Sequence, residues 1–201
     1  MIRTVISDLG KVILWFDNGI FFRKMAALCS CPEEKIREVV HRRAEMIELF
    51  DTGKITPQHF YSRAIAELNA SVSYEDFLAA YRDVFWPNPP VLELYKKLKG
   101  KYRLILLSNT DVVRFSFIKE KFPEILFFDA YVLSFEVGVM KPRPEIYEEA
   151  LKRAEAEASA CVLIDDMEEN IQAASALGLK AILYQPGTDL EKELRAFGLE
   201  F

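Results

Sequence analysis

Five short apolar runs along the chain predict buried β-strands. They are rich in Val, Ile, Leu and Tyr without clear alternation of apolar and polar positions, a pattern typical of strands covered on both faces. The runs span residues 2–8, 102–107, 130–134, 160–164 and 180–184. Each later run follows a helical pattern. We therefore predict an α/β fold in which a parallel sheet with right-handed crossovers carries helices on both faces.

Proline and glycine mark the ends of several of these helices. Pro89 and Pro90 open a helical segment that stops at Gly100, and Pro144 opens another. A further helical pattern ends at Gly178. Proline at a helix start and glycine just past a helix end agree with the backbone conformations that each residue favours.

The stretch from Asn18 to Phe85 breaks the alternation of strands and helices. It contains no strand signal, and four helical patterns follow one another, one beginning at Pro32 and another at Pro57. We predict a helical insertion directly after the first strand. Residues 86–90 should return the chain to the sheet as a stiff hinge, since residues before proline avoid the helical conformation. The predicted domains are a core of residues 1–16 and 87–201 and a helical domain of residues 17–86.

Composition and charge narrow the choice of partners. The chain has 201 residues, of which 51% are hydrophobic and 28% charged, enough to bury a full core. A net charge of -5 and a pI near 5.3 give no electrostatic footprint for nucleic acid or an anionic membrane. An anionic ligand must therefore be held by local positive charge.

The cysteines, the histidines and the N-terminus carry no specific signal. Three cysteines are an odd number, and their spacing matches no zinc pattern, so we expect reduced thiols. His41 and His59 have no acidic or cysteine partner at ligand spacing, and we expect surface or packing roles for both. One arginine precedes the first strand, without a signal-peptide pattern or a membrane-spanning run, so we predict a cytoplasmic protein.

Polar residues follow the predicted strands where ligands collect in such sheets, at the carboxyl ends. Asp8 ends the first apolar run, Ser108 and Asn109 end the second, and Asp165 with Asp166 ends the fourth. Two adjacent carboxylates after an apolar strand repel each other unless a cation is present, which favours a metal site. Taken singly, most of these residues also fit a turn or a helix cap.

Together with Lys141, these groups are the parts needed for phosphoryl transfer. Mg²⁺ would neutralise the phosphate oxygens, and Lys141 would offset the charge that grows as the phosphoryl group flattens. Asp8 would attack the phosphorus to form an aspartyl phosphate, which water hydrolyses. Ser108, Asn109 and Lys141 are the predicted phosphate ligands, and a small phosphorylated metabolite is the predicted partner.

The order of these motifs resembles the haloacid dehalogenase superfamily over nearly the whole chain. The matching segments are Asp8-Leu9-Gly10-Lys11-Val12, Leu106-Leu107-Ser108-Asn109-Thr110, Lys141-Pro142 and Ile164-Asp165-Asp166. The resemblance implies a Rossmann-like core, a small helical cap and, for most members, phosphatase activity. It implies metal ligands at Asp8, Gly10 (through its carbonyl), Asp165 and Asp166. The opening motif looks most like the sugar-phosphate phosphatases, including bacterial glucose 1-phosphate phosphatase.

One position departs from the pattern of the family. Its phosphatases usually have a second aspartate two residues after the nucleophile, as general acid and base, and this chain has Gly10. Because such catalysis contributes about 100-fold to 10,000-fold, its absence favours a leaving oxygen that needs little protonation. We therefore expect a sugar 1-phosphate or an acyl phosphate. Lys11 and Asp17 are possible substitutes for the missing group, although a position at the cap hinge explains both better.

Specificity should depend on the cap, because a cap that closes over the site excludes water and touches the rest of the substrate. The nearest candidates are Phe16, Asp17, Asn18 and Phe21. Two other functions stay open. A phosphate-binding or regulatory module with weak turnover is consistent with Gly10. A 2-haloacid dehalogenase also lacks the second aspartate, but its chemistry needs no metal, so the acidic pair argues against it.

Overall fold

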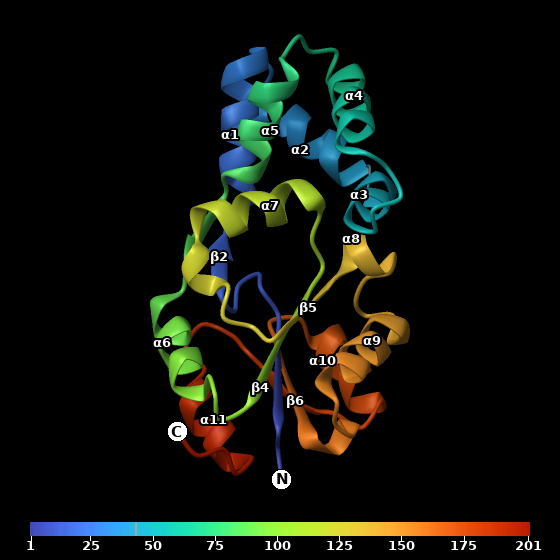
Figure 1. The fold of residues 1–201 in the computed structure, drawn as a ribbon. Helices are drawn as coiled ribbons and strands as arrows, with labels where there is room; N and C mark the ends of the chain where they lie inside the picture. The colour runs from blue at the N-terminus through green and yellow to red at the C-terminus, as the bar shows by residue number, and fades with distance from the viewer. Residues whose placement is uncertain (43) are drawn as a thin grey trace.

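A computed structural model describes residues 1–42 and 44–201, and its centre is a five-stranded parallel sheet (Figure 1). The strand order is β5-β4-β1-β6-β7, which places the first strand in the middle. The α/β fold with a Rossmann-like parallel sheet is thereby confirmed. The strands are β1 (Thr4–Ser7), β4 (Arg103–Ser108), β5 (Ala130–Leu133), β6 (Cys161–Asp165) and β7 (Lys180–Leu183).

Helices cover both faces of this sheet, which explains why the strands show no polar alternation. One buried cluster joins one side of the strands to α6 (Pro89–Leu98), α7 (Val112–Lys121) and α11 (Leu190–Ala196). A second joins the opposite side to α9 (Pro144–Ala154) and α10 (Glu168–Ala176). Alternate residues of β1 point to opposite clusters, Val5 to the first and Ile6 to the second. In Figure 1, α6 and α11 lie on one side of the strands, and α9 and α10 lie on the other.

The insertion is helical throughout most of its length and has its own buried cluster, which includes Phe21, Phe60 and Phe77. Side chains cap three of its helices at Asp17, Thr56 and Ser73. The helices are α1 (Asn18–Cys29), α2 (Glu33–Arg42), α3 (Ala44–Asp51), α4 (Pro57–Leu68) and α5 (Tyr74–Arg82). They stack beyond one end of the sheet, on the side away from both termini (Figure 1). The proposed domain boundaries stay a prediction.

The connection between the two parts differs from the expectation. Residues 85–87 are not only a hinge: β3 (Phe85–Pro87) pairs antiparallel with β2 (Leu14–Phe16). Phe85 was expected to lie in a stretch without strand character. The sequence conceals this pair because each strand has three residues, too few to show a period, and one of them ends in proline. The insertion is therefore joined to the core through a short two-stranded ribbon.

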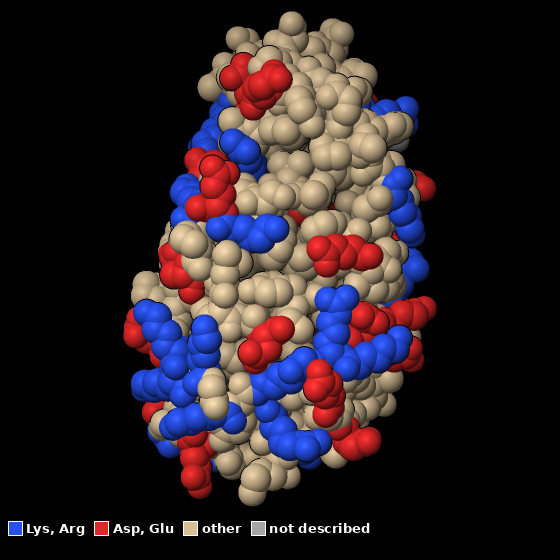
Figure 2. All heavy atoms as spheres, viewed as in Figure 1, with Lys and Arg blue, Asp and Glu red and all other residues tan. Residues whose placement is uncertain are grey.

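Several minor expectations concern groups outside the site. All three cysteines are free thiols, with Cys161 buried, and His41 and His59 are exposed. Among the described residues, no helix is both long and apolar enough to cross a bilayer. Figure 2 shows acidic and basic side chains interspersed over the core, whereas the cap on the same face carries few charges.

Cap and core touch closely at Gly53. This glycine has φ of 67°, and a Cβ placed on it would lie 2.3 Å from the carbonyl oxygen of Phe135 in α8 (Ser134–Val137). We expect Gly53→Ala to lower the free energy of unfolding by more than the roughly 1–2 kcal/mol that the left-handed conformation alone costs. Urea unfolding measures this change.

Gly100→Ala is the matched control. Gly100 has φ of 79°, and a Cβ there would meet nothing within 4 Å. This variant should show only the conformational cost of about 1–2 kcal/mol. Equal losses for the two variants would mean that the contact with Phe135 does not constrain residue 53.

Candidate active site

Three neighbouring strands bring their carboxyl ends together at the candidate site. Asp8 directly follows β1, Ser108 ends β4 and Asp165 ends β6. These side chains meet because β1 lies between β4 and β6. In the sequence, Asp8 and Asp165 are 157 positions apart (165 minus 8). All three are buried. The position agrees with the rule that ligands bind beyond the carboxyl ends of strands where the strand order reverses.

The Lys141 ammonium joins two of these groups. Its Nζ lies 2.8 Å from Asp8 Oδ1 and 2.6 Å from Asp165 Oδ2. The Lys141 side chain is only 1% exposed, and that of Asp165 is fully buried. Buried charges of this kind are tolerated only when paired. Lys141 thus joins the segment that begins at Asp8 and the segment that ends at Asp166 into one hydrogen-bonded unit.

Burial shifts the titration of this unit. It raises the pKa of Asp8 to about 7, an increase that Lys141 opposes and the carboxylate of Asp165 reinforces. Burial also disfavours the charged form of Lys141, but the attraction of Asp8 and Asp165 outweighs it and raises the pKa of Lys141 above its ordinary value. Lys141 is therefore a permanent cation at the centre of the site.

Asn109 fixes the loop that carries Lys141. Its Nδ2 donates to the carbonyl oxygen of Lys141 at 2.9 Å, and its Oδ1 accepts from the Lys141 backbone N–H at 2.8 Å. This reciprocal pair holds the start of the lysine motif against the end of β4. The amide predicted to bind phosphate thus has a clear positioning role, while the buried Ser108 lines the adjacent cavity.

The acidic side chains fit a divalent cation. Asp8, Asp165 and Asp166 each offer a carboxylate oxygen, and the three oxygens lie within 4.8 Å of one another. Mg²⁺ prefers such oxygen ligands. The Asp165 carboxylate is oriented by the backbone N–H of Met167 at 2.9 Å and by Asn170 Nδ2 at 2.8 Å. Asp166 is less buried and forms an ion pair with Lys11 Nζ at 3.4 Å.

Gly10 and Phe16 share the space beside Asp8. A Cβ on Gly10 would lie 2.9 Å from Phe16 Cε1, closer than normal contact allows. Any side chain at position 10 therefore requires the phenyl ring to move. Both residues line a cavity of about 70 Å³ at the mouth of the site, together with Ser108 and Asn109.

The comparisons with known proteins agree with this geometry. A model of the haloacid dehalogenase-like hydrolases matches residues 2–178. The chain belongs to this family. The resemblance seen in the four motifs is confirmed, whereas the narrower likeness to glucose 1-phosphate phosphatase stays a prediction.

Two proteins similar to this hydrolase are phosphatases. D-ribitol-5-phosphate phosphatase from Bacteroides thetaiotaomicron is 25% identical over 204 residues, which cover 96% of this chain and 97% of the relative. Sesquiterpene phosphatase astK from Aspergillus oryzae is 29% identical over 140 residues, covering 68% and 70%. A solved structure of a HAD family enzyme from Bacteroides thetaiotaomicron has a TM-score of 0.86 at 26% identity, covering 96% and 98%. The same enzyme has been solved with magnesium and inorganic phosphate.

The cap of this hydrolase contributes a carboxylate that the sequence did not reveal. Asp51, at the end of α3, lines the active-site cavity with Arg114 and Asp111 of the core. Burial raises the pKa of Asp51 to about 7; the nearby Asp111 adds to this increase and Arg114 opposes it. No pattern separates Asp51 from other polar positions of a cap helix. Asp111 offered a weak sequence signal, because it directly follows the segment from Leu106 to Thr110. In the structure it caps α7.

The predicted specificity residues fall in different places. Phe16 lines the active-site cavity. Asn18 and Phe21 line a separate cavity within the cap, and Asn18 Oδ1 accepts a hydrogen bond of 2.9 Å from Arg114 Nη2. Asp17 lines neither of these two cavities. It caps α1 by accepting from the Gly19 N–H at 2.7 Å, which agrees with the hinge position that we favoured.

Asp51→Asn should stabilise the hydrolase above pH 7 and change its stability little near pH 4. The pKa of Asp51 is raised to about 7 in the fold, whereas an unfolded aspartate titrates near 3.9. Between these two pKa values, Asp51 is ionised in the unfolded state and protonated in the folded state, so the free energy of unfolding of the wild type falls as the pH rises. Above pH 7 the carboxyl group is ionised in both states, and the full loss is present. The expected gain of the variant is up to about 4 kcal/mol at pH 8.

Urea unfolding of both proteins at several pH values from 4 to 8 measures this difference. A gain that appears only between pH 4 and pH 7 and is constant above that range is the expected result. A difference between the two proteins that does not vary with pH would contradict the burial of an ionisable carboxyl group at position 51.

Proposed function

We propose that this hydrolase is a Mg²⁺-dependent phosphatase of small phosphomonoesters. The observation that carries the proposal is the pairing of Lys141 with both Asp8 and Asp165 at the end of the sheet. A buried cation beside one carboxylate that can attack, and a second that can hold a metal, suits a substrate with several negative oxygens. Phosphatase activity of two relatives supports the same conclusion.

In the proposed reaction, Asp8 Oδ attacks the phosphorus and the bond from phosphorus to the leaving oxygen breaks. The leaving oxygen keeps the electron pair and takes a proton from solvent when it needs one. Water then attacks the aspartyl phosphate and loses a proton to solvent, the bond from phosphorus to Asp8 Oδ breaks, and the carboxylate is restored. Lys141 offsets the charge on the phosphoryl oxygens in both steps, and Asn109 holds its backbone in place.

Asp8, Asp165, Asp166 and the carbonyl oxygen of Gly10 are the proposed metal ligands. Mg²⁺ held there would neutralise phosphate oxygens and orient the phosphoryl group. We propose Mg²⁺ as the metal because the similar enzyme from Bacteroides thetaiotaomicron has been solved with magnesium and inorganic phosphate.

Asp8→Asn is expected to abolish phosphate release, because an amide neither attacks phosphorus nor binds Mg²⁺ as a carboxylate does. Release of inorganic phosphate from a panel of phosphomonoesters, with Mg²⁺ and with a chelator, measures the effect. The rate of phosphate release by the variant with Mg²⁺ should be as low as that of the wild type in the presence of the chelator.

Asp17→Asn is the control, since asparagine caps a helix about as well as aspartate and Asp17 caps α1. It should retain wild-type activity. Equal residual rates for wild type and Asp8→Asn would favour a phosphate-binding module instead. Halide release from 2-chloropropionate that a chelator does not diminish would favour a dehalogenase.

Gly10 leads to a second prediction, about the leaving group. Without an aspartate at this position, a sugar phosphorylated at the anomeric carbon should react faster than a primary alkyl ester. We expect glucose 1-phosphate to exceed glucose 6-phosphate in kcat/KM by about 100-fold, the lower limit of general acid catalysis. Equal values for the two sugars would indicate that another group supplies the proton.

A further inference from the structure

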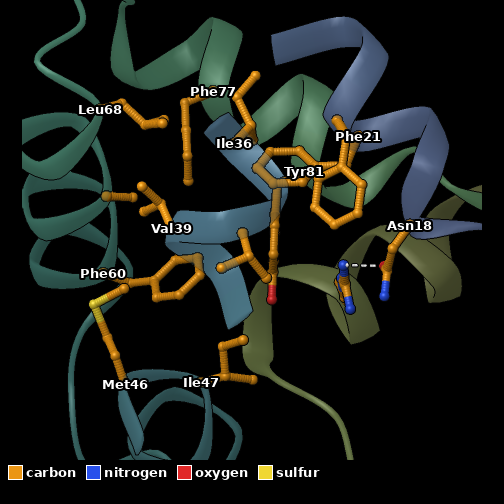
Figure 3. A pocket seen from close by; sticks show the side chains of 14 residues that line it. Asn18, Phe21, Ile36, Val39, Met46, Ile47, Phe60, Leu68, Phe77 and Tyr81 are labelled. Carbon is orange, nitrogen blue, oxygen red and sulfur yellow. Dashed lines mark hydrogen bonds between the residues drawn. The ribbon is translucent and has the colours of Figure 1, made fainter. Parts of the chain in front are cut away.

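The cap encloses an apolar cavity that the reaction at Asp8 does not use. Its volume is about 100 Å³, and side chains from α1 to α5 line it. Figure 3 shows Val39, Ile47 and Phe60 converging on this space. The polar side chains on its wall are Asn18, Tyr81 and Arg114. Arg114 is the one that comes from the core, from helix α7.

Arg114 also lines the active-site cavity, so the two spaces adjoin at its side chain. Its guanidinium lies 4.1 Å from the centre of the Tyr81 ring. Nη2 donates to Asn18 across the cavity wall, the contact drawn as a dashed line in Figure 3. The Tyr81 hydroxyl donates to Asp111 Oδ2 at 2.8 Å. A short polar seam, formed by the side chains of Asn18, Tyr81 and Arg114, therefore separates the proposed phosphate site from the apolar space.

Two considerations favour a ligand-binding role for this cavity over an ordinary packing void. An empty apolar cavity destabilises a fold, because its lining atoms lose contacts. A charged side chain is also an unusual wall for an apolar void; that of Arg114 is 19% exposed and forms an ion pair with Asp111 Oδ2 at 4.0 Å. Within the described part of the chain, the buried Nε of Arg114 has no hydrogen-bond partner. If Arg114 exchanged its contacts with Asn18, Tyr81 and Asp111 for contacts with a ligand, the two cavities would join.

We propose that the cap cavity binds an apolar chain of the substrate, whose phosphate group lies at Asp8. The inference rests on the proposed function and adds the chemical class of the leaving group. An engineered apolar cavity of about 150 Å³ holds benzene, so the smaller cap cavity suits a chain of a few carbons. A polyol in the same position would leave its hydroxyl groups unpaired against an apolar wall.

Gly10 indicates which linkage suits such a chain. An acyl phosphate satisfies both constraints, because its carboxylate leaves with the electron pair of the broken phosphorus–oxygen bond and needs no proton. The acyl chain then extends past Arg114 into the cap. Saturated acyl phosphates are also the best probes, since the leaving group stays nearly constant in basicity while the chain grows.

The test is a series of acetyl, butanoyl, hexanoyl and octanoyl phosphate. Mg²⁺-dependent hydrolysis is measured against Asp8→Asn and against the rate without enzyme. We expect kcat/KM to rise by up to about fourfold for each buried methylene until the cavity is filled, and then to stop rising. Acetyl phosphate should be the poorest substrate of the first three.

Ala64→Leu fills the cavity from α4, where Ala64 is part of the lining. It should lower kcat/KM for hexanoyl phosphate by about tenfold or more and leave acetyl phosphate unchanged. Ala26→Leu is the matched control, because Ala26 packs against the cap core without lining the cavity. Unchanged acetyl phosphate turnover also shows that each variant is folded.

The possible failures are distinguishable. Hydrolysis of acetyl phosphate that requires Asp8 and Mg²⁺, with no effect of chain length or of Ala64→Leu, would overturn the apolar site and leave the phosphatase intact. An absence of Asp8-dependent hydrolysis across the whole series and the phosphomonoester panel would overturn both proposals. A preference for glucose 1-phosphate over hexanoyl phosphate would also overturn the apolar site.

Discussion

The Lys141 ammonium, held between the carboxylates of Asp8 and Asp165, is the interaction on which the site depends. Two buried carboxylates this close would repel each other. The cation makes their approach possible, yet it leaves the pKa of Asp8 near 7 because burial is the stronger influence. The parallel sheet positions both carboxylates, since each side chain is attached at the end of one of two adjacent strands.

The cap adds a different kind of environment to this charged centre. Its cavity wall is mostly hydrocarbon, and the seam of Arg114, Tyr81 and Asn18 lies where the two environments meet. In the substrate that we propose, the two ends are recognised by separate means, with charge at the phosphate and burial at the apolar end. The short ribbon of β2 and β3 connects these two parts of the molecule.

Much of this was accessible from patterns along the chain. The five apolar runs became the five parallel strands, and Pro89 and Pro144 open helices as expected. The groups at strand ends also met, because carboxyl ends of adjacent parallel strands share one edge. Asp51 and Arg114 escaped notice because each is a polar residue on a helix, a position that is usually solvated. The β2–β3 ribbon escaped because its strands are too short to have a period.

The sequence by itself determined which chemical groups the site contains, since apolar strand patterns place Asp8, Ser108 and Asp165 at chain positions that a parallel sheet must bring together. It also determined what is missing, the side chain at Gly10. Only the tertiary structure decided what surrounds these groups: Phe16 beside Gly10, Asp51 in the cavity and a hollow within the cap. The reason is physical. Local periodicity shows where the strands lie along the chain, whereas cavities depend on how side chains from distant helices fill the space between them.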